Sequence, residues 1–418
     1  MKLTERELEQ AVLGIEFGST RIKGILIDEK GTVITGGSFT WENEWKDGIW
    51  TYSLDLAVHG LQCVYREIAE NVRSEYGLPI RRLAGIGISA MMHGRLLLGE
   101  NDRQLAPFAT WRNQISKQAS EILTERFNYH VSERYSAALL YQATLDGEPY
   151  VHEIHKALVL SSYIHYRLTG QNVVGPNEAS GMFPVDPATL QYDTGKLEIF
   201  RELVRPCGLP WDIEEILPKV IPAGGCAGRL TKEGAMLLDE SGNLEPGIPF
   251  CPPEGDGGTG LVACNALLPG VGSISAGTST LLMMTLDQWL RKPYAELDCM
   301  LNPAGKPFIM VQSNNGTGEI DRLVRLVSDI LQTFGASADV SEIYRTLYRK
   351  SLEGDPAAGG VVAFNYYAGE HLTEVKNGHP MLIWEPKSAL TLANLMRAEL
   401  YSVLGVLRIG LNLLYKEE

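Results

Sequence analysis

The sequence predicts an α/β or α+β chain that consists of two related lobes. Its 418 residues exceed what one ordinary core holds and suit two domains. A strand, a turn with one glycine and small hydroxyl residues, and a second strand occur near the start and again after residue 270. In both halves strands lead into mixed strands and helices, which is typical of a sheet that packs against helices.

The individual elements follow from apolar periodicity and from turn residues. The expected strands are residues 12–17, 21–28, 32–40, 83–89 and 96–98. The expected helices are residues 54–76, 321–334 and 390–415, and helical segments dominate residues 114–168. Residues 207–253 are rich in proline and glycine, so we place a boundary there, between domains 1–252 and 253–418.

The two repeated turns are the most informative feature of the chain. They are Gly18-Ser19-Thr20 and Gly277-Thr278-Ser279. Each turn offers backbone N–H groups and short hydroxyls to an anion, with no bulky side chain in the way. A single turn of this kind usually only connects strands, but two copies in two halves predict two lobes that grip one polyphosphate.

Two carboxylates lie close to these turns in the sequence. Asp256 stands among four glycines ahead of the second turn. Beside a transferable phosphoryl group it is a candidate base for the attacking hydroxyl, and a flexible acidic turn is the alternative. Glu16 shares a strand face with Gly18. A carboxylate there repels phosphate unless a cation lies between them, so Glu16 indicates Mg²⁺; a solvent-facing carboxylate is the alternative.

Two further segments suit a polyol or a sugar. Met92 and His93 follow the buried strand expected at residues 83–89, where a loop side chain can point into a cleft. His93 can hydrogen-bond a hydroxyl, although a lone histidine is more often structural. Trp111 and Asn113 combine an aromatic plate with an amide, a mixture that fits the C–H faces and hydroxyls of a sugar; ordinary packing of Trp111 is the alternative.

Composition narrows the range of partners and of compartments. The formal net charge of −14 argues against a general nucleic-acid binder. No apolar run approaches the roughly 20 residues of a membrane-spanning helix, and the charged N-terminus lacks the apolar core of a secretion signal. The six cysteines form no C-x-x-C pair, so we expect buried reduced thiols in a cytoplasmic protein rather than a zinc site or a disulfide framework.

In their order along the chain, these motifs resemble the FGGY family of carbohydrate kinases, and the xylulokinase-like members in particular. The segments that carry the resemblance are residues 14–20, 87–94, 111–114, 177–182, 255–256, 277–279, 364–371 and 397–400. Any one of them is weak evidence, but eight in the right order cover nearly the whole chain and are specific.

The resemblance implies a two-domain, actin-like ATPase fold with ribonuclease-H-like lobes, in which ATP and a sugar meet in the interdomain cleft. It implies that Asp256 accepts the proton of a sugar hydroxyl and that Mg²⁺ near Glu16 offsets the phosphate charge. The residues implied to hold phosphate oxygens are Gly18, Ser19, Thr20, Gly277, Thr278 and Ser279. The residues implied to contact the sugar are Met92, His93, Trp111, Asn113 and Asp256.

The chain also departs from the family pattern. Glu16 and Asn113 stand where many members have Asp, and Ile115 stands where many have Arg. Family members continue well past the helix expected at residues 390–415, through a glycine-rich adenine-binding segment. We therefore expect an incomplete second domain, exposed apolar surface on it, poor nucleotide affinity and impaired activity.

The leading functional hypothesis is an ATP-dependent kinase of a small sugar or polyol. The Met92-His93-Gly94 segment favours a ketopentose such as xylulose. Two alternatives remain open: a catalytically degenerate sugar-binding or sensor protein of the same fold, and another ATPase of the same superfold. The assembly state is also open, and a homodimer is one possibility.

Overall fold

The computed structural model describes residues 3–277 and 279–417 and divides the chain into two compact units. Unit 1 consists of Met1–Val271, Thr285–Ala295 and Cys299–Phe308, and unit 2 consists of Gly272–Met284, Glu296–Asp298 and Ile309–Glu418. Unit 1 extends beyond the boundary expected at residues 252–253, because the strand Glu254–Gly255 pairs with a strand of the first sheet.

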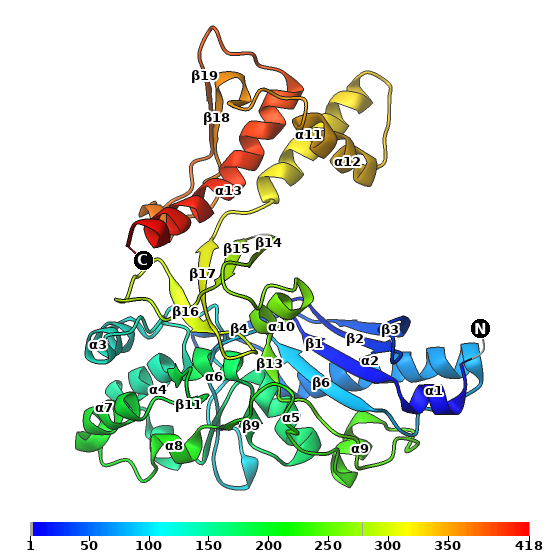
Figure 1. Ribbon diagram of the computed structural model, residues 1–418, viewed down its shortest axis with the longest axis vertical. Helices are drawn as coiled ribbons and strands as arrows, with labels where there is room; N and C mark the ends of the chain where they lie inside the picture. Colours follow the sequence, from blue (N-terminus) through cyan, green and yellow to red (C-terminus); the bar gives the residue numbers. More distant parts are fainter. Residues whose placement is uncertain (1–2, 278, 418) are drawn as a thin grey trace. The chain divides into compact units, whose positions relative to one another are not determined.

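The first sheet belongs to unit 1 and has five strands in the described part of the chain (Figure 1). Its strands lie in the order β13 (Glu254–Gly255), β6 (Gly85–Ala90), β1 (Val12–Phe17), β2 (Arg21–Ile27) and β3 (Val33–Thr40). β1 is parallel to β6, β6 is parallel to β13, and β1, β2 and β3 form an antiparallel meander. The carboxyl ends of β1, β6 and β13 therefore meet at one edge of the sheet.

Alternation along β1 separates the two faces of this sheet. Leu13 and Ile15 are buried on one face, together with the apolar side of α2 (Leu54–Tyr76). Gly24, which pairs with Ile15, lies so close to α2 that a Cβ there would be 2.5 Å from Cγ1 of Val64. Glu16 points to the opposite face, which lines a groove.

The rest of unit 1 consists of short elements around this sheet. The further helices are α1 (Glu5–Glu9), α3 (Lys117–Phe127), α4 (Ser136–Leu145), α5 (Leu160–Thr169), α6 (Pro176–Met182), α7 (Thr194–Val204), α8 (Ile213–Ile216), α9 (Lys232–Leu238) and α10 (Asp256–Ala263). The further strands are β4 (Glu44–Lys46), β5 (Ile49–Thr51), β7 (Leu96–Leu98), β8 (Lys156–Leu158), β9 (Val173–Val174), β10 (Val185–Asp186), β11 (Gln191–Tyr192) and β12 (Lys219–Val220).

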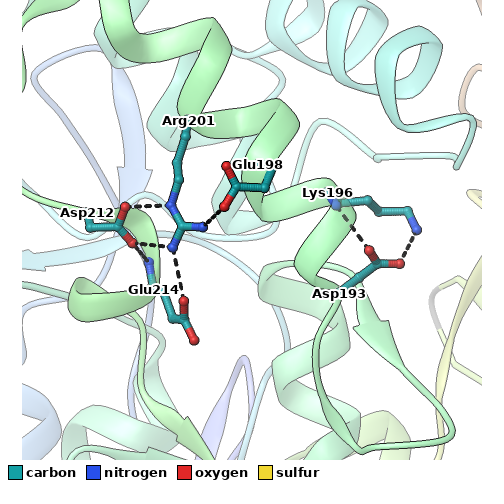
Figure 2. A network of polar contacts seen from close by, with 6 residues as sticks. All are labelled: Asp193, Lys196, Glu198, Arg201, Asp212 and Glu214. Atoms are coloured by element: carbon teal, nitrogen blue, oxygen red, sulfur yellow. Dashed lines mark hydrogen bonds and ion pairs between the residues drawn. The ribbon is translucent and has the colours of Figure 1, made fainter.

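A charged network ties α7 to α8, and Figure 2 shows it from close by. Arg201 of α7 donates to both carboxylate oxygens of Asp212, at 2.6 and 2.8 Å, and to Glu214 at 3.0 Å. Asp193 caps the start of α7 by accepting the backbone N–H of Lys196 at 3.0 Å. The bidentate geometry makes the contact between Arg201 and Asp212 better defined than an ordinary surface ion pair.

The second hairpin belongs to a sheet in the order β14 (Gly272–Ala276), β15 (Thr280–Thr285), β17 (Pro307–Ser313) and β16 (Asp298–Leu301). Unit 2 also contains β18 (Val361–Phe364), β19 (Met381–Trp384), α11 (Gly318–Thr333), α12 (Val340–Ser351) and α13 (Leu392–Glu417). Its core brings together α11, α12 and α13 through Ile320, Leu323, Val324, Ile343, Leu347, Met396 and Val403.

By length and composition alone, α13 is apolar enough to cross a membrane, so the expectation that no segment meets this criterion is wrong. The evidence for a membrane span is weak, because the core helix of a soluble protein passes the same test. About two-fifths of the most apolar window of α13 is buried, at 39%, and Met396 and Val403 belong to the core of unit 2.

The structure confirms the strongly patterned elements. The helix expected at residues 54–76 is α2, and the first three expected strands are β1, β2 and β3. The last two expected helices are α11 and α13, each with bounds within a few residues. Cys299 is buried as expected, but Cys207, Cys226, Cys251 and Cys264 are exposed, so the expectation of buried thiols is wrong for these four.

Candidate active site

A groove of about 1060 Å³ lies over the open face of the first sheet. Glu254 of β13, Ser89 of β6, Glu16 of β1 and Lys23 of β2 occupy one row across the strands and all line this groove. Asp256, the first residue of α10, lines it as well. The groove therefore brings carboxyl groups from β1, β13 and α10 together.

Asp256 lies where β13 passes into α10. Its Oδ1 accepts the backbone N–H of Gly257 at 2.9 Å and that of Met92 at 3.3 Å. The residue keeps access to solvent at the groove, but the surrounding protein buries its carboxyl enough to raise the pKa to about 6, with the charge of Glu16 adding to the rise. A carboxyl with this pKa is largely ionised at neutral pH and still basic enough to accept a proton.

The loop that follows β6 has an unusual backbone. His93 adopts a φ of +69° and Gly94 a φ of +95°, and only the glycine favours such values. The backbone N–H of His93 donates to Oε1 of Glu178 at 3.3 Å. Its ring is buried, stacks on Tyr135 at 5.1 Å and donates from Nδ1 to the carbonyl of Gly181 at 3.4 Å.

Two buried carboxyl groups lie behind this loop. Glu178 of α6 is fully buried, and its Oε2 accepts the hydroxyl of Ser161 at 3.1 Å. Glu254 accepts the backbone N–H of Glu178 at 3.0 Å and so caps the start of α6. Burial raises the pKa of Glu178 well above its usual range and that of Glu254 to about 8.

The first hairpin turn is supported from behind. The carbonyls of Gly18 and Ser19 accept the indole N–H of Trp41 and the hydroxyl of Tyr52, both at 2.7 Å. The carbonyl of Thr20 accepts the backbone N–H of Trp41 at 3.2 Å. Among the described residues, the backbone N–H groups of Ser19 and Thr20 have no hydrogen-bond partner. The turn therefore presents donors and two exposed hydroxyls, as an anion site requires.

Glu16 precedes this turn on β1. Its Oε2 is 3.8 Å from Nζ of Lys23, and both side chains are about half exposed, at 44% and 57%. The carboxylate is therefore accessible from the groove rather than locked in a buried pair. An accessible oxygen donor of this kind fits a hard cation such as Mg²⁺.

The second hairpin turn lies in unit 2 and is held in a similar way. The carbonyl of Gly277 accepts both the backbone N–H of Thr317, at 2.8 Å, and its hydroxyl, at 3.1 Å. The N–H of Gly277 donates to the carbonyl of Ser279 at 3.0 Å. Thr278, the middle residue of the expected phosphate turn, lies outside the described residues.

Trp111 and Asn113 lie in a loop that follows Ala109. Ala109 forms an isolated β-bridge with Arg95, the residue before β7. Asn113 is buried: its Oδ1 accepts the backbone N–H of Trp50 at 2.8 Å, and its Nδ2 donates to the carbonyl of Trp50 at 2.8 Å. Trp111 is half-buried and packs against the core of unit 1. The Asn113 amide therefore fixes the loop to β5.

Within unit 1 the structure brings Asp256 into contact with Met92 and places Glu16 in the same groove. Sequence reasoning gave no role to four residues that support the site, which are Trp41, Tyr52, Glu178 and Glu254. Trp41 directly follows the strand expected at residues 32–40, and an indole N–H in a buried position needs an acceptor. Glu178 lies in the family-like segment 177–182, but its partners are far away in the sequence, so no local pattern predicts its contacts.

Comparisons with known proteins agree with this arrangement. Residues 11–263 match the N-terminal domain of the FGGY family of carbohydrate kinases, and residues 272–418 match the C-terminal domain of that family. The chain is 23% identical to a xylulose kinase of Haemophilus influenzae, over 96% of this chain and 79% of that protein. It is 24% identical to a gluconokinase of Bacillus licheniformis, over 86% of this chain and 68% of that protein.

Solved structures share the fold. The crystal structure of a xylulose kinase from Rhodospirillum rubrum superposes with a TM-score of 0.75 at 20% identity, covering 98% of this chain and 79% of that one. This likeness confirms the expected two-domain, actin-like fold. The expectation of an incomplete second domain is not borne out, because the C-terminal domain match extends through residue 418. The expected poor nucleotide affinity and impaired activity stay predictions.

Proposed function

The chain belongs to the FGGY family of carbohydrate kinases, and we propose that Asp256 is the general base with which it phosphorylates a sugar. The enzyme is an ATP-dependent sugar kinase. The observation that carries the assignment of Asp256 is its place in the groove, with Oδ1 held by two backbone N–H groups and the carboxyl still accessible. Such a carboxylate is fixed in direction and free to accept the hydroxyl proton as the phosphoryl group is transferred.

The phosphate groups of ATP are assigned to the two hairpin turns. The free N–H groups and hydroxyls of Ser19 and Thr20 support this assignment for the first turn. Gly277 and Ser279, with Thr278 between them, are given the same task on the strength of the repeated sequence. Glu16 would hold Mg²⁺, which supplies positive charge against the phosphates, and Lys23 lies beside it on the next strand.

The proposed substrate is a ketopentose such as xylulose. The names of the relatives support a sugar or sugar acid, and the Met92-His93-Gly94 segment supports the ketose. We assign direct contact with the sugar to Trp111, whose side chain is half-buried. Because the Met92 side chain, the His93 ring and the Asn113 amide are buried, these three act on the sugar by holding their loops.

The remaining proposals concern the setting of the enzyme. The net charge of −14 supports a protein that does not bind nucleic acid, and scattered cysteines without a C-x-x-C pair support the cytoplasm as its compartment. The core contacts of α13 support a protein that is not inserted in a membrane. A homodimer stays a prediction, to be checked by light scattering.

The test is a coupled assay of ADP release with D-xylulose, D-ribulose, gluconate and glycerol as acceptors. Asp256→Asn should lower kcat by about 10³-fold, because general-base catalysis is worth roughly 10²–10⁴-fold. Asp239→Asn is the matched control, since Asp239 is a buried carboxylate that holds a turn at Ser241, outside the residues that line the groove. Full activity in Asp256→Asn would remove Asp256 from this role; sugar binding without turnover in the unmodified protein would favour a sensor.

A further inference from the structure

The loop between β6 and β7 holds a conformation that its sequence does not favour. His93 has a φ of +69°, in the left-handed region that non-glycine residues rarely adopt. Such a backbone persists only when the surrounding structure imposes it. The contacts of this loop therefore show which residues hold the backbone of His93 in this conformation.

Two successive N–H groups of this loop point at two different carboxyl groups. Met92 donates to Oδ1 of Asp256, and His93 donates to Oε1 of Glu178, each at 3.3 Å. The first acceptor is the proposed base. The second is the carboxyl group of Glu178, which has no exposed surface and no role in the proposed proton transfer.

Glu178 is itself fixed to β13, the strand that leads into Asp256. Its backbone N–H donates to Oε2 of Glu254 at 3.0 Å. Glu254 lies in β13, two residues before Asp256, which begins α10. A Cβ on Gly175, at the start of α6, would be 2.2 Å from the carboxyl of Glu254, so the two elements are in close contact. The loop, α6 and the base thus form one connected group.

We propose that Glu178 is a positioning residue that holds the strained Met92–His93 loop against Asp256 and so fixes the direction in which the base meets the sugar. This inference rests on the proposed function, because it assumes that Asp256 is the base. It adds a residue that touches neither substrate and acts through two hydrogen bonds.

The surroundings of Glu178 indicate that it works in its neutral form. The titratable groups that face it are Asp256 and Glu254 on one side, His93 in the loop and Tyr192 of β11. Tyr135, the residue before α4, stacks on His93. No Lys or Arg forms an ion pair with it in the part of the chain that the structure describes. Burial and the charges of Asp256 and Glu254 raise its pKa.

A neutral Glu178 can keep both of its contacts. Its Oε1 accepts the His93 N–H, while a protonated Oε2 can donate to the Ser161 hydroxyl, which both donates and accepts. Ionisation at alkaline pH would place a second negative charge beside Asp256 and loosen the group. Activity should therefore fall on the alkaline side as Glu178 ionises.

The experiment compares Glu178→Ala and Glu178→Gln in steady-state assays with D-xylulose and ATP. The alanine variant should lower kcat/KM for the sugar by about 10- to 100-fold and leave KM for ATP unchanged, since small misplacements of a reacting group have effects of about this size. The glutamine variant keeps a neutral acceptor, so it should restore kcat/KM to within about threefold of the parent. It should also lack the alkaline fall in activity.

The controls separate this role from general destabilisation. Asp239→Ala removes another buried carboxylate of unit 1 and should lower thermal stability without changing KM for the sugar. A folded Glu178→Ala variant with parental kcat and KM would overturn the proposal. If that variant does not fold, a Glu178→Gln profile that superposes on the parent at alkaline pH would overturn it. Wild-type activity in Asp256→Asn would instead refute the proposed base.

Discussion

At the scale of single residues, two carboxyl groups of unit 1 have different tasks because their surroundings differ. Asp256 keeps solvent access and accepts two backbone N–H groups on one oxygen, whereas Glu178 has no exposed surface. Burial raises the pKa of both, that of Asp256 to about 6. The same functional group thus meets solvent in one place and has no solvent access in the other, which favours the neutral form of Glu178.

The pH dependence of activity and stability should show this for Asp256. Its folded pKa of about 6 exceeds the unfolded value of about 3.9, so the folded state holds the proton more tightly and stability falls as pH rises through this window. Activity should have the opposite dependence and fall as pH drops below about 6, because the base becomes protonated. Asp256→Asn should therefore raise the melting temperature at neutral pH while it removes activity.

Both parts can be measured, by kcat/KM between about pH 5 and pH 8 and by thermal denaturation at neutral pH. Asp239→Asn serves as the control and should lower the melting temperature, because Asp239 accepts three hydrogen bonds in its turn. A less stable Asp256→Asn variant would contradict the assignment of a raised pKa.

At the scale of elements, each phosphate turn depends on residues outside it. Trp41 and Tyr52 take up the carbonyls of the first turn, and Thr317 takes up that of Gly277 in the second. Because these supports occupy the carbonyls of the first turn, its N–H groups stay available to an anion. The anion site is therefore a property of the hairpin together with its supports.

Trp41→Phe tests this support by removing the indole N–H that binds the carbonyl of Gly18 at 2.7 Å. We expect KM for ATP to rise several-fold and stability to fall by about 1 kcal/mol, the usual contribution of one hydrogen bond. Trp211→Phe is the matched control, because its indole N–H binds the carbonyl of Val151 at 2.6 Å and neither residue lines the groove. The Trp211→Phe variant should lose similar stability and leave KM for ATP unchanged. An equal rise of KM for ATP in both variants would argue against a role of Trp41 in the turn.

A second element-scale prediction concerns the passage from β13 into α10. A Cβ on Gly255 would be 2.2 Å from Cγ of Met92, so Gly255→Ala should displace Met92 and raise KM for the sugar. Gly405→Ala in α13 is the control, since its Cβ would meet no atom within 4 Å and Gly405 does not line the groove. There the change should be neutral or stabilise by up to about 1 kcal/mol, because alanine favours helix. Equal KM values in the two variants would contradict this account, and sugar titrations followed by ADP release would show it.

At the scale of the whole molecule, each unit has a core of its own, and unit 2 contains an acidic pair inside its core. Glu319 of α11 and Glu399 of α13 are buried, with Arg322 nearby, whose guanidinium lies 3.7 Å from the centre of the Tyr367 ring. Burial, and for Glu319 the adjoining carboxyl of Glu399, raises the pKa of both groups. A proton held on this pair therefore favours the folded state.

The stability of the protein should depend on this proton. Because both folded pKa values lie above the ordinary glutamate value, the folded state binds more protons, and stability should fall as pH rises above about 4.5. Glu399→Gln should flatten this dependence in melting temperatures measured across a pH series. Glu342→Gln, at an exposed position of α12, should leave the dependence intact, and an unchanged slope in Glu399→Gln would contradict the role of the pair.

The sequence by itself determined the elements and the chemistry they carry. Period-two and helical patterns located β1, β2, β3 and α2, because these patterns follow from which side of an element is buried. The order of the glycine turns, Asp256 and the Met92–His93 segment indicated a sugar kinase, and the family match supports this. These features are local, so a few adjacent residues suffice to specify them.

Only the tertiary structure decided what surrounds those residues. Glu178 meets His93 across 85 positions of the chain, and Glu254 meets Glu178 across 76, so no local pattern could pair them. Asn113 was a candidate sugar ligand by residue type, but folding gives its amide to the backbone of Trp50. Burial, charge state and hydrogen-bond partners depend on segments that meet only in the folded chain, which is why they had to be found in the structure.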